Sequence, residues 1–340
     1  MRLKLFPENI LERLALLSGR LPEPLLELYF SMGISSTLIA GLRLNIFELV
    51  KSGKNTWEEI VRETGSNPEG IRTLLDALNG FGYLKKKGDR YLLTRKTEKW
   101  ILGDFIESYL LMADIKDRFA NLEEVIKRGG KSDFHDNKNP EFWEHYLIGI
   151  YKFSKIASKE VAFRLRMKRG GGRVLDLGGG HGLYTATLLK MNRRLQGVIL
   201  DLPEACKIGK RIVKIEGVEN RVRFLEGDMR EIEWGGGYDL VLFFNIIHIF
   251  TEEENIILLK RAREVLNEGG RIAILDSEFP DKEDLSAVAG FNQLLFYLIN
   301  NSRVFNESRI KKWVEVAGYR RIRRSRLLTV PMTLFLTAQK

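Results

Sequence analysis

Glycines gather in one short segment that follows an apolar run and precedes a helix-forming run. Residues 174–182 read VLDLGGGHG, and the glycines at 178, 180 and 182 form a G-x-G-x-G pattern. Glycine lets the backbone turn tightly and lets a ligand lie directly against it. We therefore expect Gly178, Gly180 and Gly182 to form a cofactor-binding loop between a strand and a helix.

The sequence of this loop distinguishes between two classes of cofactor. The dinucleotide fingerprint G-x-G-x-x-G requires a small residue at position 183, where this chain has Leu183. The loop therefore fits a class I methyltransferase better than a dehydrogenase. In a methyltransferase the loop holds the methionyl part of S-adenosylmethionine, which leaves as S-adenosylhomocysteine. Asp176, at the end of the preceding strand, suits an acceptor for the ammonium group of this cofactor or for an ordered water.

Two further acids follow the next two predicted strands. Asp201 ends the strand GVILD, and an acid at this place accepts hydrogen bonds from both ribose hydroxyls. A dehydrogenase would use the same residue, so Asp201 alone does not discriminate. In the segment GDM, Asp228 can accept from the adenine amino group and Met229 can pack on the ring. We expect two neighbouring residues to complete the cofactor site: Leu202 and Asn245.

His248 is the candidate catalytic residue. It comes just beyond the fourth predicted strand, and residues beyond the carboxyl ends of parallel strands face the ligand crevice. Methyl transfer to a phenol benefits from a base, since a phenol with a pKa near 10 is mostly protonated at neutral pH. A neutral histidine suits this task, and a nearby cationic sulfonium disfavours its protonated form.

The first hundred residues must fold into helices and a short hairpin. Apolar residues recur at helical spacing over residues 25–32, and a second helix is expected over residues 37–50. Thr56 and Glu59 form a capping box for a third helix that ends at Gly65. A fourth helix spans residues 68–80, and the segment YLKKKGDRYLLT predicts a hairpin that turns at residues 88–89. This order is typical of a winged helix.

The second half must fold into a covered parallel sheet. Residues 101–165 are again helical, with a polar break at GGKSDFHDNKNP. From residue 173, strand-length apolar runs alternate with helices: RVLDLG, GVILD, VRFLEGD, DLVLFFN and RIAILD. Continuous apolar strands between helices indicate a parallel sheet that is covered on both faces. Helices follow over residues 285–318, and two further strands are expected to form a closing hairpin across Pro331.

Composition and charge limit the class of protein. The chain has 340 residues, 44% of them hydrophobic, which suffices for two globular domains. Its one cysteine, Cys206, is interpreted as a packing residue, and its lone presence fits a cytoplasmic protein. We expect neither a signal peptide nor a membrane span. The net charge is +10, and the densest cluster of basic residues is residues 320–326. We interpret this cluster as an edge strand whose charges prevent pairing with other strands, with anion binding as the alternative.

The chain resembles the small-molecule O-methyltransferases with an N-terminal dimerisation domain, the type that includes the plant caffeate and hydroxyindole enzymes. In the first half the resemblance rests on NIFELVKSG, TWEEIVRETG, IRTLLDALNGFGYL and RYLLT. In the second it rests on VLDLGGGHG, LDLPE, RVRFLEGDM and the segment around FFNIIHIFTEEE. The family's fold implies a Rossmann-like α/β domain with a seven-stranded, mostly parallel sheet.

The resemblance also assigns domains and residues. It implies a winged-helix-like dimerisation domain over residues 1–105, linking helices that contribute to the acceptor pocket over 106–165, and a cofactor-binding domain over 166–340. His248 matches the family's base, and Asp276 matches an acid that orients the base and stabilises its imidazolium form. Ile249 stands where the plant enzymes have aspartate, and Ser302 stands where they have a second orienting glutamate. The expected partners are a second copy of the chain and a small, aromatic acceptor.

Other functional interpretations remain open. Methyl transfer to nitrogen or carbon needs correct positioning more than a base. A cofactor-binding DNA regulator is a rival, but the predicted recognition helix carries only Arg72 as a basic residue, so we do not expect nucleic acid to bind. His181 is expected to contact cofactor or solvent, and His145 to pack in the core or line the acceptor pocket. His135 and Asp136 lack a converging ligand cluster, so no metal is expected.

Overall fold

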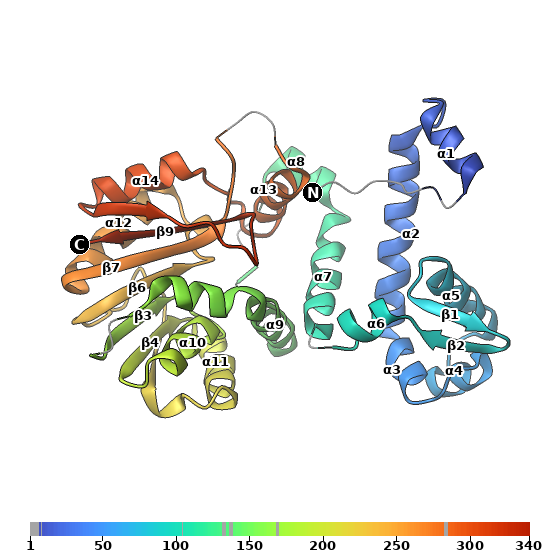
Figure 1. Ribbon diagram of the computed structural model, residues 1–340, viewed down its shortest axis with the longest axis horizontal. Helices are drawn as coiled ribbons and strands as arrows, with labels where there is room; N and C mark the ends of the chain where they lie inside the picture. The colour runs from blue at the N-terminus through green and yellow to red at the C-terminus, as the bar shows by residue number, and fades with distance from the viewer. Residues whose placement is uncertain are drawn as a thin grey trace. The chain divides into compact units, whose positions relative to one another are not determined.

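The computed structural model of the protein describes residue 7 and residues 9–103, 105–130, 134–135, 139–167, 170–281 and 285–340 (Figure 1). The chain folds as two compact units, which succeed one another between Asp114 and Ile115. The sequence predicted no signal peptide at the start of the chain. Most of the first residues, on which that expectation rests, lie outside the described ranges.

The N-terminal unit has the predicted winged-helix order of elements. Its helices and strands are α1 (Ile10–Leu17), α2 (Glu23–Arg43), α3 (Ile46–Lys51), α4 (Trp57–Thr64), α5 (Pro68–Gly80), β1 (Leu84–Lys87), β2 (Arg90–Leu93), α6 (Arg95–Trp100) and the start of α7 (Ile106–Phe119). β1 and β2 pair as an antiparallel hairpin across Gly88 and Asp89, as predicted. Residues of α2, α3, α4 and α5 pack in one apolar core that includes Phe47, Ile60 and Leu75.

Capping residues set the ends of the central helices in this unit. The Thr56 hydroxyl accepts from the Glu59 amide, and the Glu59 carboxylate accepts from the Thr56 amide, so the predicted capping box is present. Gly65 ends α4 with a φ of 63°, a conformation that glycine adopts at little cost. Asn67 caps α5 by accepting from the Gly70 amide. The cap residues therefore fix α4 and α5 locally, as the sequence predicted.

One predicted boundary in this unit is wrong. A second helix was expected over residues 37–50, but α2 runs unbroken from Glu23 to Arg43 and the break falls at Asn45. The Ser35 hydroxyl donates to the Met32 carbonyl, so this polar side chain has a hydrogen-bond partner within the continuous helix. Asn45 has a φ of 53°, a left-handed conformation that asparagine tolerates better than most residues. The turn therefore occurs at the asparagine and α3 starts after it.

The helices α1 and α2 expose many large apolar side chains, which include Ile10, Leu11, Leu14, Leu17, Leu25, Leu28, Tyr29 and Met32. Among the described residues, α2 is long and apolar enough to cross a membrane, by length and composition alone. The sequence predicted no membrane span. Core helices of soluble proteins can have the same length and apolar composition. The exposed apolar surface on α1 and α2 therefore requires a cover of some kind.

The C-terminal unit is built on a seven-stranded sheet. The strands are β3 (Gly172–Leu177), β4 (Leu195–Asp201), β5 (Val222–Glu226), β6 (Tyr238–Phe244), β7 (Leu266–Ser277), β8 (Arg320–Arg324) and β9 (Thr333–Gln339). Their order is β5-β4-β3-β6-β7-β9-β8. The first five strands are parallel, whereas β9 is antiparallel to both β7 and β8. This is the predicted mostly parallel sheet with its closing hairpin.

Helices cover both faces of the sheet (Figure 1). The helices of this unit are α8 (Leu122–Arg128), α9 (Pro140–Leu165), α10 (Leu183–Met191), α11 (Pro203–Ile215), α12 (Glu252–Val265), α13 (Ala287–Asn300) and α14 (Glu307–Val316). Those that pack on the sheet are α9, α10, α11, α12 and α14. Alternate residues of a strand point to opposite faces, so Val174 packs with residues of α9 and α10, and Leu175 with residues of α12 and α14. Both faces of the sheet are thus apolar cores, and polar chemistry is confined to the strand ends.

Candidate cofactor and acceptor site

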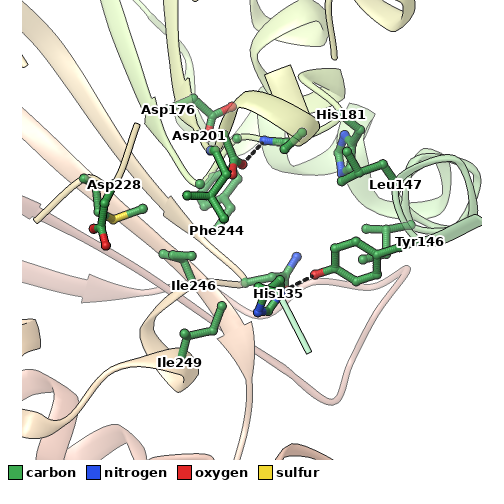
Figure 2. A pocket seen from close by; sticks show the side chains of 18 of the residues that line it. His135, Tyr146, Leu147, Asp176, His181, Asp201, Asp228, Phe244, Ile246 and Ile249 are labelled. Carbon is green, nitrogen blue, oxygen red and sulfur yellow. Dashed lines mark hydrogen bonds between the residues drawn. The ribbon is translucent and has the colours of Figure 1, made fainter. Parts of the chain in front are cut away.

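A cavity of about 490 Å³ lies beyond the carboxyl ends of the parallel strands (Figure 2). Residues that directly follow β3, β4, β5 and β6 line it, as the rule for open parallel sheets predicts. The lining residues that the sequence had singled out are His135, Asp176, Gly178, Gly180, His181, Asp201, Leu202, Asp228, Met229, Asn245 and Ile249. The fold therefore brings most of the predicted cofactor residues to one cavity.

The glycine loop follows β3 closely and leaves no room for side chains. Gly178 has a φ of 64°, and a Cβ atom there would lie 2.6 Å from Cδ1 of Ile246. At Gly180, with a φ of 41°, a Cβ atom would lie 3.1 Å from Cδ2 of Leu147. Gly182 does not line the cavity. It begins α10 with a φ of 68° and allows the helix to approach Ile199, so its role is in helix–strand packing.

Asp176 presents an unpartnered carboxylate oxygen at the end of β3. Its Oδ2 accepts a hydrogen bond from the Thr185 hydroxyl at 2.7 Å, whereas its buried Oδ1 has no partner among the described residues. Burial, together with the nearby Asp201 charge, raises the pKa of Asp176 to about 7. A buried, unpaired acceptor beside the glycine loop fits the ammonium group of S-adenosylmethionine, which would supply the missing donor.

Asp201 is fixed by the backbone at the end of β4. The amides of Gly180 and Leu202 each donate to its carboxylate at 2.7 Å (Figure 2). Burial raises the pKa of Asp201 to about 6, although these two bonds oppose the shift. The carboxylate lines the cavity with its orientation set, which suits a bidentate acceptor for two ribose hydroxyls.

Asp228 already has a partner, which the sequence reading did not foresee. The guanidinium of Arg230 donates to its carboxylate, with the shortest contact at 2.6 Å, and also reaches Glu254 at 3.2 Å. The hydrogen bond from Arg230 is the main cause that lowers the pKa of Asp228. Both Arg230 and Glu254 line the cavity. The sequence indicates the pairing of Arg230 with Asp228 only through the position of Arg230 directly after the GDM segment.

Asn245 and His181 complete the polar wall of the cavity. Asn245 follows β6 with a φ of 52°, and its amide donates to the Leu275 carbonyl at 2.6 Å. Asparagine tolerates this left-handed conformation better than most residues. Burial lowers the pKa of His181 to about 4, and its Nδ1 accepts from the Leu183 amide, so the ring is neutral at pH 7. His181 is thus held as a neutral ring against the cavity.

His248 and Asp276 form a buried pair next to the cavity. Nδ1 of His248 lies 2.8 Å from Oδ1 of Asp276, and the imidazole stacks on Phe296 with ring centroids 3.9 Å apart. Neither residue is among the described residues that line the cavity, but Asn245, Ile246 and Ile249 of the same β6–α12 segment are. The structure therefore places the two predicted catalytic residues together, behind the wall that their neighbours form.

Aromatic residues of α9 line one side of the cavity. Trp143 and Tyr146 both face it, and Tyr146 Oη lies 3.2 Å from Nε2 of His135 (Figure 2). His145 lies on the same helix but does not line the cavity. The sequence did not indicate Asn300 and Asn301, which close the cavity at the end of α13. They come from a segment whose pattern signals only an apolar helix.

A metal site was not expected, and no group of three or more metal-ligating side chains occurs in the described ranges. Asp136, which the sequence had brought into consideration with His135, lies outside those ranges. Cys206 is fully buried, and its Sγ contacts the carbonyls of Asp201 and Leu225. It therefore packs beneath the cofactor loop, as expected.

Comparisons with known proteins agree with this geometry. A family model described as an O-methyltransferase domain matches residues 115–320, and a model of the O-methyltransferase dimerisation domain matches residues 26–101. The chain is 27% identical over 300 residues to L-tyrosine C(3)-methyltransferase from Streptomyces lavendulae, with 82% of each chain covered. It is 22% identical to 3-hydroxy-5-methyl-1-naphthoate 3-O-methyltransferase from Streptomyces sahachiroi, covering 89% of this chain and 90% of that one.

A solved structure shares the fold over almost the whole length. Human N-acetylserotonin methyltransferase in complex with S-adenosylmethionine superposes with a TM-score of 0.81 at 16% identity, covering 98% of each chain. The family model covers more than half of this chain, and the cavity carries the residue types that this cofactor requires. The protein belongs to the family of S-adenosylmethionine-dependent O-methyltransferases with an N-terminal dimerisation domain.

Proposed function

We propose that the protein transfers a methyl group from S-adenosylmethionine to a hydroxyl oxygen of a small aromatic acceptor, with His248 as general base. The observation that carries the proposal is the 2.8 Å hydrogen bond between His248 and Asp276, which fixes an imidazole behind the wall of the cofactor cavity that Asn245, Ile246 and Ile249 form. The acceptor would stack among Trp143, Tyr146 and their neighbours, which supply the aromatic wall.

The cofactor would be held by the three strand-end acids and their neighbours. Asp176 would accept from its ammonium group, Asp201 from its ribose hydroxyls, and Met229 and Leu202 would pack on the adenine ring. Asp228 would share its carboxylate between Arg230 and the adenine amino group. When bound, S-adenosylmethionine supplies an electrophilic methyl carbon on a cationic sulfur. The protein's main contribution to the rate would be to align the acceptor oxygen with this carbon.

The base would act through the nitrogen that faces away from Asp276. Nε2 of His248 would accept a hydrogen bond from the acceptor hydroxyl and take its proton, while the cofactor would supply the methyl group from its sulfur and leave as S-adenosylhomocysteine. Nδ1–H donates to Asp276, which holds the ring in the correct tautomer and stabilises the imidazolium. The reaction requires Nε2 to reach the cavity, and catalytic contacts commonly tighten only when both substrates are bound.

The three segments of the chain would have the roles that the resemblance implies. Residues 1–105 would dimerise through the apolar surface of α1 and α2, residues 106–165 would contribute to the acceptor pocket, and residues 166–340 would bind the cofactor. The lining residues on α9 support the second assignment, because they belong to this intermediate segment. Coverage of α2 by a second copy explains its apolar exposure without a membrane, so we place the enzyme in the cytoplasm.

Methyl transfer to carbon is the second candidate. It is favoured by the similarity to a tyrosine C(3)-methyltransferase, the relative with 27% identity. In that reaction an ortho carbon of a phenol attacks the methyl group, and a base at the phenol oxygen would still assist. Methyl transfer to nitrogen, in contrast, would depend on positioning alone.

A DNA-binding regulator without turnover is not favoured. The guanidinium of Arg72 on α5 lies 3.6 Å from the centroid of the Trp57 ring, and Lys86 of the wing pairs with Asp76 at 3.3 Å. These basic groups already have partners within the unit, whereas a DNA-reading helix presents a basic face to the phosphates. We therefore propose that nucleic acid is not a partner.

A labelled-methyl assay tests the proposal. The wild type, His248→Ala and the control His145→Ala would be incubated with labelled S-adenosylmethionine and a panel of phenols, indoles, amines and short RNAs. We expect label on a phenolic oxygen, a loss of about 10²-fold or more in His248→Ala, and little change in His145→Ala. Binding of S-adenosylhomocysteine by all three proteins would show that the fold is intact.

Other outcomes would change the assignment. Label on carbon would select the second candidate, and label on nitrogen would remove the need for a base. Equal activity of His248→Ala and the wild type would exclude His248 as the base while the family assignment stands.

A further inference from the structure

A second cavity, also of about 490 Å³, lies at the opposite edge of the sheet from the cofactor cavity. Its lining includes Gly171 and Asp239, at the amino ends of β3 and β6, Arg271 in the middle of β7, and Thr337 and Gln339 near the end of β9, where Gln339 pairs with Arg271. The cofactor cavity lies at the carboxyl ends of the same parallel strands. The two cavities share no lining residue, so a ligand in one does not displace a ligand in the other.

The local structure of β8 brings two arginines to this second cavity. β8 pairs with β9 through Arg320 opposite Gln339 and Arg323 opposite Thr337, so one extra residue lies between these pairs as a bulge. Arg321, in the bulge, has a φ of 52°, and its Nη1 donates to Oε1 of Gln339 at 3.2 Å. Arg321 and Arg323 both line the cavity, whereas Arg320 does not. Bulges of this kind commonly redirect side chains toward a site.

Arg271 contributes a third guanidinium that lacks a carboxylate partner in the described part of the chain. Its Nη2 donates to the carbonyls of Leu165 and Arg166 at the end of α9, and it contacts Sδ of Met167 at 3.5 Å. Burial lowers the pKa of Arg271. A half-buried cation without a counterion is stabilised by any anion that can reach it.

The acidic residues around this cavity are already engaged. Asp239 accepts from the Arg173 amide at 2.8 Å and from the Asn267 side chain at 3.0 Å. Glu268 is almost fully exposed and pairs with Lys340 at 3.4 Å. For Arg323, the described residues provide neither a side-chain hydrogen bond nor an ion pair. The cavity therefore has guanidinium groups in its lining together with two carboxylates, of which Glu268 is paired with Lys340.

We propose that this second cavity, lined by Arg271, Arg321 and Arg323, is a binding site for a phosphate-bearing small molecule. Guanidinium groups present planar pairs of donors that match phosphate oxygens, and three of them around one cavity suit a di- or triphosphate better than a single carboxylate. The volume lies within the range of small-molecule sites. The phosphate could be free pyrophosphate or the phosphate chain of a nucleotide, and the site recognises the oxyanion that the two share.

Calorimetric titration of the whole protein tests this proposal. Pyrophosphate and adenosine triphosphate would each be titrated at low ionic strength, with the cofactor cavity saturated by S-adenosylhomocysteine. We expect one saturable site per chain and an affinity that falls as salt is added. Arg323→Ser and Arg321→Ser should each weaken binding by about tenfold, the scale of one charged hydrogen bond. Arg320→Ser, on the same strand but outside the cavity, should bind like the wild type.

The two ligands and the variants give clear outcomes. Equal binding of pyrophosphate and the nucleotide would support a site that recognises phosphate alone, and tighter binding of the nucleotide would support a site that also contacts the nucleoside. Absence of saturable binding to both ligands would overturn the proposal. Equal losses in Arg320→Ser and Arg323→Ser would also overturn it, since they would indicate general attraction to a basic surface.

Discussion

Nδ1 of His248 lies 2.8 Å from Oδ1 of Asp276, although 28 residues separate the two in the chain. They meet because β6 and β7 are adjacent parallel strands, and each residue lies at or just beyond the carboxyl end of its strand. The same Oδ1 atom accepts from the Ser277 amide at 2.7 Å, while Oδ2 is buried without a partner among the described residues. The carboxylate is therefore fixed by its own backbone and in turn fixes the imidazole.

Replacement of Asp276 by asparagine should lower turnover without loss of cofactor binding. The asparagine amide can donate to Nδ1 and would favour the tautomer that has the proton on Nε2, where it cannot act as a base. We expect kcat to fall on the order of 10²-fold, the contribution of a positioned base, with S-adenosylhomocysteine affinity unchanged. Steady-state kinetics and calorimetry on the same preparation would measure both quantities.

Glu278→Gln is the matched control for this variant. Glu278 lies two residues further along and pairs with Arg324 at 2.7 Å, away from His248. It should retain nearly full activity. If Asp276→Asn were as active as Glu278→Gln, the pair would be a structural contact and not part of the reaction.

Binding of S-adenosylhomocysteine should strengthen as the pH rises from about 5 to about 7. The pKa of Asp176 is raised to about 7 in the unliganded protein, so the carboxyl is largely protonated at low pH. The ligand's ammonium group favours the carboxylate and lowers this pKa, so binding releases a proton. The affinity should rise by up to about tenfold per pH unit below the pKa and level off above it. Calorimetric titrations at several pH values would record the slope.

Two variants separate the contributions to that slope. Asp176→Asn should remove most of it, and the remainder would come from Asp201, whose pKa is raised to about 6. Asp228→Asn should retain the slope, because the bond from Arg230 lowers the pKa of Asp228 and keeps it ionised over this range. An unchanged slope in Asp176→Asn would contradict the assignment of Asp176 to the ammonium group.

Gly178→Ala should impair both stability and cofactor binding. The new Cβ atom would lie 2.6 Å from Cδ1 of Ile246, and the residue has a φ of 64°. Gly217→Ala is the control, because Gly217 has a φ of 69° but no atom lies within 4 Å of its Cβ position. The control should lose about 1 kcal/mol of the free energy of unfolding from its backbone alone. Gly178→Ala should lose more and should also bind S-adenosylhomocysteine at least about tenfold more weakly.

Chemical denaturation and calorimetry would compare the two alanine variants. Equal losses of stability, with unchanged ligand affinity in both, would show that the loop adapts to a side chain. The close approach of Ile246 would then have no part in shaping the cofactor cavity.

The sequence predicted the parts of this structure that depend on local rules. Thr56, Gly65 and Asn67 set helix ends through caps that involve only near neighbours, and the apolar strands of the sheet follow from their burial on both faces. Asp176 and Asp201 were located because strand ends in a parallel sheet meet at one edge. Such features need no knowledge of side-chain packing.

Features that depend on tertiary packing were missed. The break between α2 and α3 falls at Asn45 because the serine-containing segment before it remains helical, which spacing alone does not reveal. The approach of α10 to Ile199 at Gly182 was not foreseen, and the expected contact of Gly182 with the cofactor stays a prediction. The pairing of Arg230 with Asp228 and the closure of the cavity by Asn300 likewise depend on side-chain positions in space.

The apolar surface of α2 predicts a dimer that one charge should weaken. Leu28 is 61% exposed in the single chain, and in a two-fold dimer each substitution occurs twice. Leu28→Glu should raise the dissociation constant roughly 100-fold or more, since a charge would be buried where an apolar side chain had been. Ile257→Glu is the control, because Ile257 on α12 is 56% exposed outside the dimerisation domain. Light scattering should show twice the 39.2 kDa chain mass for the wild type and the control, and a shift toward the single chain for Leu28→Glu. A dimer of unchanged affinity in Leu28→Glu would show that the interface lies elsewhere. The exposed apolar side chains of α2 would then be covered by something other than a second copy of the chain.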